Sequence, residues 1–231
     1  MKRQRIPEVM DGPSVDERAH AHALRSLNRI AQLLGFDRQQ YRCLKNLIGN
    51  HASVLDIGCG GGGFLGHIAR QQGPESACKL IGLDYSTFAL NCARLWQGER
   101  IRVLASDARR LPFSNDSIDV VTCALFLHHF DEADAVIILR EAARVARRGI
   151  VIADLSRSWP AWALTWLVTR VVSRSWIFHV DGPRSVRAAY DPGELIDLAR
   201  LAGLEGARVK RRFPFRLMLT WKKASTSLAK S

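Results

Sequence analysis

The chain has 231 residues, of which 47% are hydrophobic and 24% charged, so it is long enough for one α/β domain with a sizeable core and short for two. Its longest apolar stretch, Trp159 to Val172, is interrupted by Arg170 and falls short of the roughly 20 residues that a membrane span needs. Five scattered cysteines without a C-x-x-C pair argue against a disulfide framework or a zinc site. No apolar run follows Met1 to Gly12 as a secretory signal would require, and together these features predict a cytoplasmic protein.

The net charge of +12 is unevenly distributed along the chain. Residues 1–50 hold 9 Lys/Arg and 5 Asp/Glu, residues 51–155 hold 11 and 12, and residues 156–231 hold 14 and 5. The basic excess therefore lies in the flanks, above all in the carboxyl-terminal third. Nucleic acid, an anionic membrane surface, an acidic substrate or a merely solvated basic face are each compatible with it.

The first 50 residues have helical periodicity. Asp16 is placed to cap a helix whose apolar residues recur every three or four positions until Gly35. A second, shorter helix is expected from Arg38 to Ile48. We expect these helices to form a cap that closes one side of the site described below.

From residue 53, short apolar runs alternate with helical patterns. The predicted strands are Ser53–Ile57, Lys79–Asp84, Ile101–Ala105, Ile118–Leu127 and Gly149–Leu155. The predicted helices between them are Phe64–Gln71, Ser86–Trp96 and Ala133–Ala146. This alternation indicates βαβ units, and hence an α/β fold with a parallel sheet and right-handed crossovers.

The alternation is interrupted after the fifth strand. Ser156 to Tyr190 is predicted to be a Trp-rich helical stretch followed by a polar loop, and Pro192 to Ala202 to be a helix. Two strand-like runs, Ala207–Phe213 and Phe215–Trp221, are close enough to form a hairpin. The tail after Lys223 is expected to fray.

Glycines are concentrated where the first strand turns into a helix, at Gly58-Cys59-Gly60-Gly61-Gly62-Gly63. Glycine adopts positive φ and lets a ligand approach the backbone, while the helix that follows offers unpaired N–H groups. Gly58, Gly60 and Gly63 also satisfy G-x-G-x-x-G, so the glycines alone do not separate a nicotinamide or flavin enzyme from a methyltransferase.

Three acidic residues distinguish these classes. Asp56 lies just before the turn, where a carboxylate would repel a pyrophosphate but favour an amino group. Asp84 ends the second strand, where a Rossmann fold places a ribose-binding acid, and Asp107 follows the third strand, suited to an adenine amino group. No Lys or Arg is expected near the turn to bind phosphates. A ligand with an amino-acid end, a ribose and an adenine but no phosphate describes S-adenosylmethionine.

Four segments in order resemble the class I S-adenosylmethionine-dependent methyltransferases over about residues 50–155. Val54–Gly62 is similar to the family's first motif, Leu80–Ser86 to its second strand, Asp107–Ala108 with Leu111–Phe113 to its adenine turn, and Phe113–Val121 to its fourth strand. Among its branches, the chain most resembles the small-molecule enzymes, including ubiquinone/menaquinone-type methyltransferases. Parts of the N-terminal and 156–190 segments resemble bacterial methyltransferases of phenolic or polyketide products.

The resemblance implies a seven-stranded, mostly parallel Rossmann-like sheet in the order 3-2-1-4-5-7-6, with helices on both faces. It implies a single domain with a helical cap (1–50), a cofactor-binding core (51–155), a substrate lid (156–190) and a carboxyl-terminal helix and strand hairpin (191–231). The expected cofactor is S-adenosyl-L-methionine, and no metal is expected. The residues expected to bind the cofactor are Asp56, Gly58, Gly60, Gly62, Asp84, Tyr85, Asp107, Ala108 and Leu125.

Three histidines are candidates for a base that deprotonates a methyl acceptor. His128 and His129 follow the fourth strand, where they either line the pocket or cap the turn. His179 lies in the segment after the fifth strand, with a catalytic and a surface role both open. Arg187 and Tyr190 belong to the same segment as candidate substrate contacts, although ordinary surface roles suit them as well.

Four of the six tryptophans lie between Trp159 and Trp176. Their helix either closes on the sheet, forms a hydrophobic lid in which Trp162 and Trp166 contact an aromatic or long-chain acceptor, or lies at a membrane interface with Arg170 and Arg174. We therefore expect methylation of an apolar, phenolic, quinone-like or polyketide molecule on oxygen or carbon, with possible peripheral membrane contact through the basic carboxyl-terminal third.

Two other functions stay open. A nucleic-acid methyltransferase would suit the basic carboxyl-terminal third, but Ala124–Leu127 replaces the Asn/Asp-Pro-Pro-aromatic run of amino-directed DNA enzymes, and no Pro-Cys pair suits cytosine chemistry. A catalytically silent cofactor-binding module would have the same acids without turnover. The sequence leaves the oligomeric state open.

Overall fold

The computed structural model describes residues 1–10, 12 and 15–224, and within them seven strands form one sheet in the order β3-β2-β1-β4-β5-β7-β6. The strands are β1 (Ser53–Ile57), β2 (Lys79–Asp84), β3 (Ile101–Ala105), β4 (Ile118–Ala124), β5 (Ala146–Leu155), β6 (Arg208–Arg212) and β7 (Arg216–Lys222). β1 to β5 pair in parallel, and β7 is antiparallel to both neighbours. The predicted fold class and strand order are confirmed.

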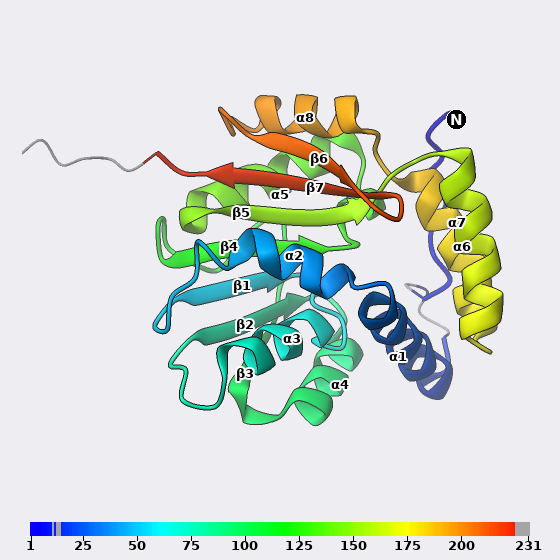
Figure 1. Ribbon diagram of the computed structural model, residues 1–231, viewed down its shortest axis with the longest axis horizontal. Coiled ribbons are helices and arrows are strands. Elements are labelled where there is room, and N and C mark those ends of the chain that lie inside the picture. The colour runs from blue at the N-terminus through cyan, green and yellow to red at the C-terminus, as the bar shows by residue number, and fades with distance from the viewer. Residues whose placement is uncertain (11, 13–14, 225–231) are drawn as a thin grey trace, which may run out of the picture.

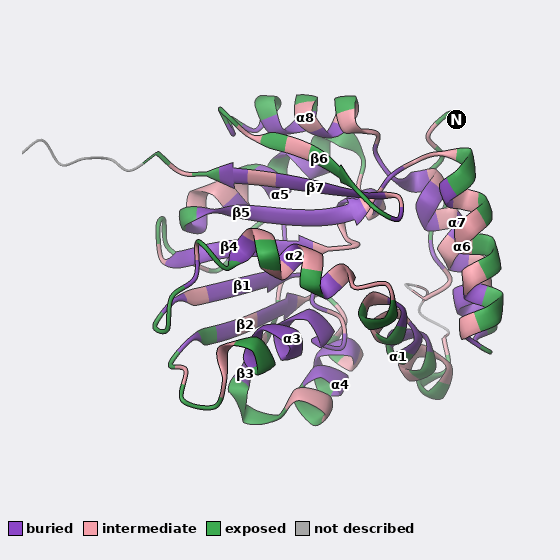
Figure 2. Ribbon diagram, in the orientation of Figure 1, coloured by how far each residue is buried: buried purple, intermediate pink, exposed green. Residues whose placement is uncertain are grey.

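Helices cover both faces of the sheet (Figure 1). On one face lie α2 (Phe36–Leu44), α3 (Gly63–Gln72) and α4 (Thr87–Gln97), with the short helix η1 (Gly98–Arg100) after α4. On the other face lie α5 (Glu132–Val145) and α8 (Pro192–Leu201). β4 and β5 are buried along most of their length, as Figure 2 shows, because helices cover both of their faces.

Three further helices gather at the carboxyl ends of the parallel strands, on the right of Figure 1. They are α1 (Glu17–Leu33), α6 (Trp159–Val172) and α7 (Trp176–Ala188). Asp16 caps α1 as predicted, accepting a hydrogen bond from the Ala19 N–H at 3.0 Å. No helix of the described chain is long and apolar enough to cross a membrane.

The N-terminal segment, residues 1–10, is fixed along α7. The N–H groups of Val9 and Met10 donate to the two carboxylate oxygens of Asp181 at 2.8 and 2.9 Å. The N–H of Gln4 donates to the carbonyl of Arg187 at 2.9 Å. This segment therefore forms a strap over the carboxyl edge of the sheet.

Two predicted elements were wrong in detail. β4 ends at Ala124 rather than at Leu127, because Leu125 adopts a positive φ of 54° and turns the chain into the short helix η2 (Leu127–His129). The predicted polar loop before Tyr190 is the helix α7. Gly182 lies inside this helix and permits its close packing on α6, since a Cβ there would lie 2.8 Å from Thr169 Cγ2.

Candidate active site

The turn after β1 brings its backbone against neighbouring side chains. Gly58 has a φ of +68°, and a Cβ there would lie 2.2 Å from the Phe126 ring. The N–H groups of Gly58 and Cys59 donate to the carbonyl of Leu83 at 2.7 and 3.0 Å. Only glycine satisfies both the conformation and the space at position 58, so the turn is held close to β2.

A cavity of about 950 Å³ opens above this turn. Most of the residues predicted to bind the cofactor line it, namely Asp56, Gly58, Gly60, Asp84, Tyr85, Asp107, Ala108 and Leu125. Gly62 is not among the lining residues; its φ of +71° places it at the N-cap of α3. Helix α1 supplies part of the opposite wall through Glu17, His20, Leu24 and Asn28.

Asp56 is a buried carboxylate with one oxygen that lacks a partner. The side chain is 2% exposed, and Oδ1 has no hydrogen bond from any described residue. Burial, and then the nearby Asp37 and Asp84, raise its pKa well above the usual value. A cationic or hydrogen-bond-donating ligand group is the partner this oxygen lacks.

Asp84 lies at the end of β2 as predicted, and its carboxylate braces the turn. Oδ2 accepts a hydrogen bond from the Gly60 N–H at 2.8 Å, and Oδ1 accepts one from the Ser86 N–H at 2.9 Å. The carboxylate also lines the cavity, so it joins the glycine turn to the ligand space.

Asp107 has a basic partner that the sequence did not suggest. Arg109 lies 2.8 Å from its Oδ2 and also pairs with Asp134 at 3.2 Å. The hydrogen bonds from Arg109 lower the pKa of Asp107. The expectation that no Lys or Arg lies at this site was therefore wrong, since Arg109 and Arg216 both line the cavity. Arg109 is already neutralised by two carboxylates.

A second, smaller cavity of about 130 Å³ adjoins the first. Its walls are mainly apolar and come from α1, α6 and α7. The two cavities share five lining residues: Met10, Leu27, Leu125, His129 and Arg216. A polar space suited to the cofactor thus meets an apolar space suited to an acceptor.

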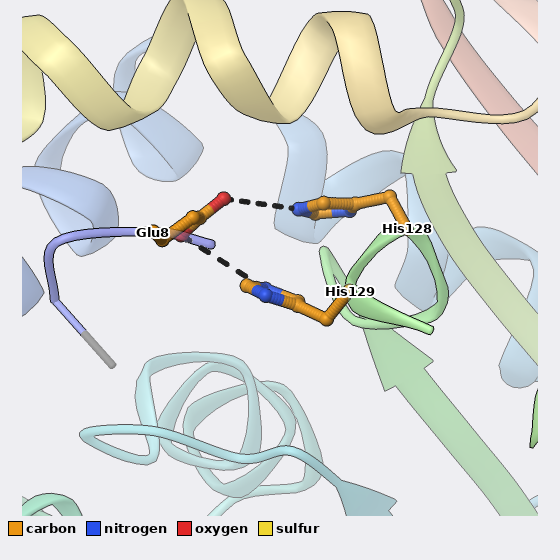
Figure 3. A group of neighbouring side chains, drawn as sticks. All are labelled: Glu8, His128 and His129. Carbon is orange, nitrogen blue, oxygen red and sulfur yellow. Dashed lines mark ion pairs between the residues drawn. The ribbon is translucent and has the colours of Figure 1, made fainter. Parts of the chain in front are cut away.

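His128 and Glu8 form a buried ion pair beside the smaller cavity (Figure 3). His128 Nε2 lies 3.5 Å from Glu8 Oε1, and its Nδ1 lies 2.7 Å from Asp154 Oδ1. Burial lowers the pKa of His128, but the charges and hydrogen bonds of Asp154 and Glu8 outweigh this effect and raise it to about 10. At neutral pH His128 is therefore an imidazolium between two carboxylates.

His129 lies on the ligand side of this group. Its ring stacks on that of His128 with centroids 4.4 Å apart, and its Nε2 lies 4.0 Å from Glu8 Oε2. Unlike His128, it lines both cavities. Of the three predicted candidate bases, it is therefore the one placed at the junction between the two spaces.

Glu8, His128 and His129 have the composition of a possible metal site. Their ligand atoms lie within 4.8 Å of one another, with one carboxylate and two imidazoles. Between Asp154 and Glu8 the ring of His128 is protonated, and the three side chains form an ion-paired network. A metal bound here would have to displace the proton of His128.

The remaining candidates, His179 and Arg187 in α7 and Tyr190 just after it, lie elsewhere. His179 Nε2 is 2.7 Å from the carbonyl oxygen of Ser173, and the ring lines neither of the two cavities. Tyr190 donates its hydroxyl to the carbonyl of Phe130 at 2.9 Å, under the Arg3 guanidinium. Arg187 pairs with the Gln4 side chain. Tyr190 and Arg187 thus contact the N-terminal strap and neither cavity.

Trp162 and Trp166 also lie away from both cavities. Trp162 packs edge-on against Trp159, and Trp166 is 43% exposed beneath Arg170. The cavity is instead lined by the opposite face of α6, through Ala161, Leu164, Thr165, Val168 and Thr169. The predicted apolar wall of the helix is present, but Trp162 and Trp166, which were expected to form it, do not line the cavity.

Two polar residues of the site were missed from the sequence. Glu8 lies in a segment without periodicity, and nothing in its neighbours indicates that it meets His128, 120 positions later. Arg216 stands among many basic residues of the carboxyl-terminal third, which as a group were compatible with binding of nucleic acid, a membrane or an acidic substrate, and with a solvated surface. Its position on an inner strand beside β5 distinguishes it, and that position requires the topology.

Comparisons with known proteins agree with this arrangement. The sequence family described as a methyltransferase domain matches residues 54–149. A ubiquinone/menaquinone biosynthesis C-methyltransferase of Cupriavidus necator is 30% identical over 165 residues, which cover 66% of this chain and 67% of that protein. A norajmaline N-methyltransferase of Rauvolfia serpentina is 35% identical over 109 residues, covering 45% and 35%.

Solved structures share the fold at low sequence identity. A SAM-dependent methyltransferase of Aquifex aeolicus matches with a TM-score of 0.62 at 19% identity, covering 91% of this chain and 100% of that one. The plantazolicin methyltransferase, solved with a desmethyl-plantazolicin analogue and SAH, matches with a TM-score of 0.64 at 16% identity, covering 90% and 95%.

Proposed function

The chain belongs to the class I S-adenosylmethionine-dependent methyltransferases, and from this premise we propose that it methylates an apolar small molecule, of phenolic, quinone-like or polyketide type, on oxygen or carbon. The observation that carries the proposal is the position of His129, which lines both the polar cavity and the apolar one. The quinone-type relative from Cupriavidus necator supports the same class of acceptor.

The larger cavity fits S-adenosylmethionine, which supplies a methyl group already activated on a sulfonium. The unpartnered Oδ1 of Asp56 suits the amino group, Asp84 at the end of β2 suits the ribose, and Asp107 with Ala108 suits the adenine. Gly58 and Gly60 also line this cavity, so the backbone of the turn forms part of its wall. The chain's contribution is to align the acceptor with the methyl group and exclude water.

The smaller cavity is suited to hold the acceptor's apolar body. Leu164 and Val168 of α6 and Ile177 and Phe178 of α7 form much of its wall. Burying such a ligand removes apolar surface from water at about 25 cal/mol per Å². Its reactive atom would then lie beside Leu125 and His129, where the two cavities meet.

His129 is proposed to take the proton that an acceptor hydroxyl must lose. Glu8 and Asp154 carry two negative charges against the one positive charge of His128. The net charge of Glu8, His128 and Asp154 together is therefore −1, and it is balanced when His129 takes up a proton. The Asp154–His128–Glu8 chain of contacts thereby positions Glu8 to stabilise the protonated His129 ring.

A labelled-methyl transfer assay tests the proposal. The panel contains phenols, quinols and alkylresorcinols, with transfer RNA as a macromolecular alternative, and mass spectrometry locates the methyl group. We expect methylation of an apolar phenolic or quinol-type compound, and a Leu164→Trp variant that fills the smaller cavity should lose it while still binding S-adenosylhomocysteine. Methylation of transfer RNA alone, unaffected by Leu164→Trp, would contradict the proposed acceptor class.

A further inference from the structure

Arg216 is a buried cation without a full set of partners. It begins β7 and is 4% exposed, yet its Nη1 has no hydrogen-bond partner among the described residues. Its guanidinium lies 4.3 Å above the Phe36 ring. Burial lowers its pKa to about 10, which reflects the cost of holding this charge away from water.

The carboxylates nearest to Arg216 do not form an ion pair with it. Asp154 lies close enough to influence its charge but is already hydrogen-bonded to His128 at 2.7 Å. Asp37 is also buried, and burial raises its pKa despite the nearby guanidinium. No carboxylate of the described chain lies within 4.0 Å of Arg216, so its orphaned N–H group is left to a ligand.

The position of Arg216 identifies where that ligand lies. Its side chain lines both cavities, as does His129. A guanidinium binds a carboxylate through two parallel hydrogen bonds, and this geometry combined with charge neutralisation offsets the desolvation of Arg216. We infer that Arg216 binds a ligand carboxylate where the two cavities meet.

Two molecules can supply that carboxylate. One is the amino-acid end of the cofactor, because a carboxyl oxygen of Asp56 and an N–H group of Arg216 both lack partners in one cavity, as the α-amino and α-carboxylate groups of that end require. The other is an acidic acceptor in the smaller cavity, whose wall Arg216 also forms. This inference rests on the proposed function. If the acceptor supplies the carboxylate, the class of acceptor is narrowed to carboxylic acids.

Calorimetric titration distinguishes the two sources of the carboxylate, cofactor and acceptor, and needs no catalytic turnover. S-adenosylhomocysteine and its decarboxylated analogue are titrated into the wild type, Arg216→Met, Arg216→Lys and the exposed control Arg212→Met. If the cofactor supplies the carboxylate, Arg216→Met should weaken the binding of S-adenosylhomocysteine by about 10- to 100-fold and leave the affinity for the decarboxylated analogue unchanged. Arg216→Lys should recover part of the lost affinity. Arg212→Met should match the wild type.

The acceptor arm uses aromatic carboxylic acids and their methyl esters as binding probes. If the acceptor supplies the carboxylate, S-adenosylhomocysteine binds Arg216→Met normally, while the acids lose affinity and the esters do not. Unchanged binding of every carboxylate by a folded Arg216→Met protein would overturn the inference. Failure to find any methylated acceptor would instead count against the proposed function, because neither binding arm depends on turnover.

A separate observation concerns the outer face of α6. Trp159, Trp166, Leu167 and Val171 are 66%, 43%, 52% and 76% exposed, and Trp176 beyond the helix is 59% exposed. Arg170 and Arg174 are exposed beside them, and no acidic residue occurs from Trp159 to Val180. Exposed Trp and Leu side chains in a segment that holds arginines and no acidic residue are typical of helices that lie in the headgroup region of an anionic bilayer.

We propose that this face docks on an anionic lipid surface. The inner face of the same helix lines the smaller cavity, so docking would place that cavity next to the bilayer. This arrangement locates membrane contact on α6 rather than on the basic carboxyl-terminal third as a whole. The positive charge complements the headgroups, and the tryptophans suit the interface.

Co-sedimentation tests the docking surface. The wild type should bind phosphatidylcholine vesicles that contain phosphatidylglycerol, bind pure phosphatidylcholine less, and lose binding in high salt. Trp166→Ser with Leu167→Ser should abolish binding, whereas Leu33→Ser on α1, which is 71% exposed, should not. No vesicle binding by the wild type, or a dimer in analytical ultracentrifugation that the double variant converts to a monomer, would overturn this proposal.

Discussion

The imidazole of His128 and the carboxylate of Asp154 are joined twice, through side chain and backbone. Nδ1 of His128 lies 2.7 Å from Oδ1, and the His128 N–H donates to Oδ2 at 3.1 Å. The two contacts fix η2 to the end of β5 and set the orientation of the ring. They also direct Nε2 towards Glu8 of the strap, so the position of His129 depends on both neighbours.

The pairing of His128 with Asp154 should make the folded protein less stable as the pH becomes alkaline. The pKa of His128 is raised from 6.5 to about 10, so the folded state holds a proton that the unfolded state releases. The resulting stabilisation is complete below about pH 6.5 and is lost as the pH rises towards 10. Urea unfolding across this range should show the decline. A His128→Gln variant, which has no titrating ring, should show a shallower dependence; an equal slope would mean that other groups cause it.

His129 should matter for catalysis more than for cofactor binding. We expect His129→Ala to lower kcat by about 10²- to 10⁴-fold on a hydroxyl acceptor, because a positioned base contributes about that much. Its affinity for S-adenosylhomocysteine should be unchanged. His179→Ala is the matched control, since that ring contacts Ser173 and lines neither cavity, and it should retain wild-type kcat. Equal losses in both variants would remove His129 from the proposed role.

Local patterns were sufficient to predict the parallel strands, because each strand has a short apolar run and each crossover helix its own periodicity. Ser53–Ile57, Lys79–Asp84 and Ile101–Ala105 were predicted with the bounds that the structure has. The order of the strands came from the resemblance to the methyltransferase family. The glycine turn and the three acids share one edge because the carboxyl ends of parallel strands meet there.

The contacts around the acceptor cavity were not predictable in this way. Trp162 and Trp166 are two of the three tryptophans of α6, and composition alone suggested that they bind the ligand. Which face of an almost wholly apolar helix turns inward is decided by its packing on α7, where Gly182 admits Thr169. Glu8 and Arg216 reach the site through long-range topology, for which a single sequence has no local signal.

The Glu8–His128–His129 group should work without a metal. Because His128 is held as an imidazolium, dialysis against EDTA is expected to leave both the methyltransferase activity and the thermal unfolding midpoint unchanged. Elemental analysis of the purified protein should find no stoichiometric transition metal. Loss of activity in EDTA that one divalent cation restores, and that Glu8→Gln prevents, would instead establish the group as a metal site.

Gly58 is required for two reasons, its positive φ and the nearby Phe126 ring, and substitutions can measure the two effects separately. Gly58→Ala and Gly35→Ala both force alanine into the same positive φ of +68°, and each should cost about 1–2 kcal/mol of stability for that reason. Only at Gly58 would the new Cβ also meet the Phe126 ring, 2.2 Å away, whereas nothing lies within 4 Å at Gly35. Gly58→Ala should therefore be the more destabilised of the two in urea unfolding, and it alone should lose affinity for S-adenosylhomocysteine. A second substitution, Phe126→Ala, removes the ring and should recover part of the difference. If Gly58→Ala and Gly35→Ala instead bind the ligand equally well, the turn is not the wall of the cofactor site.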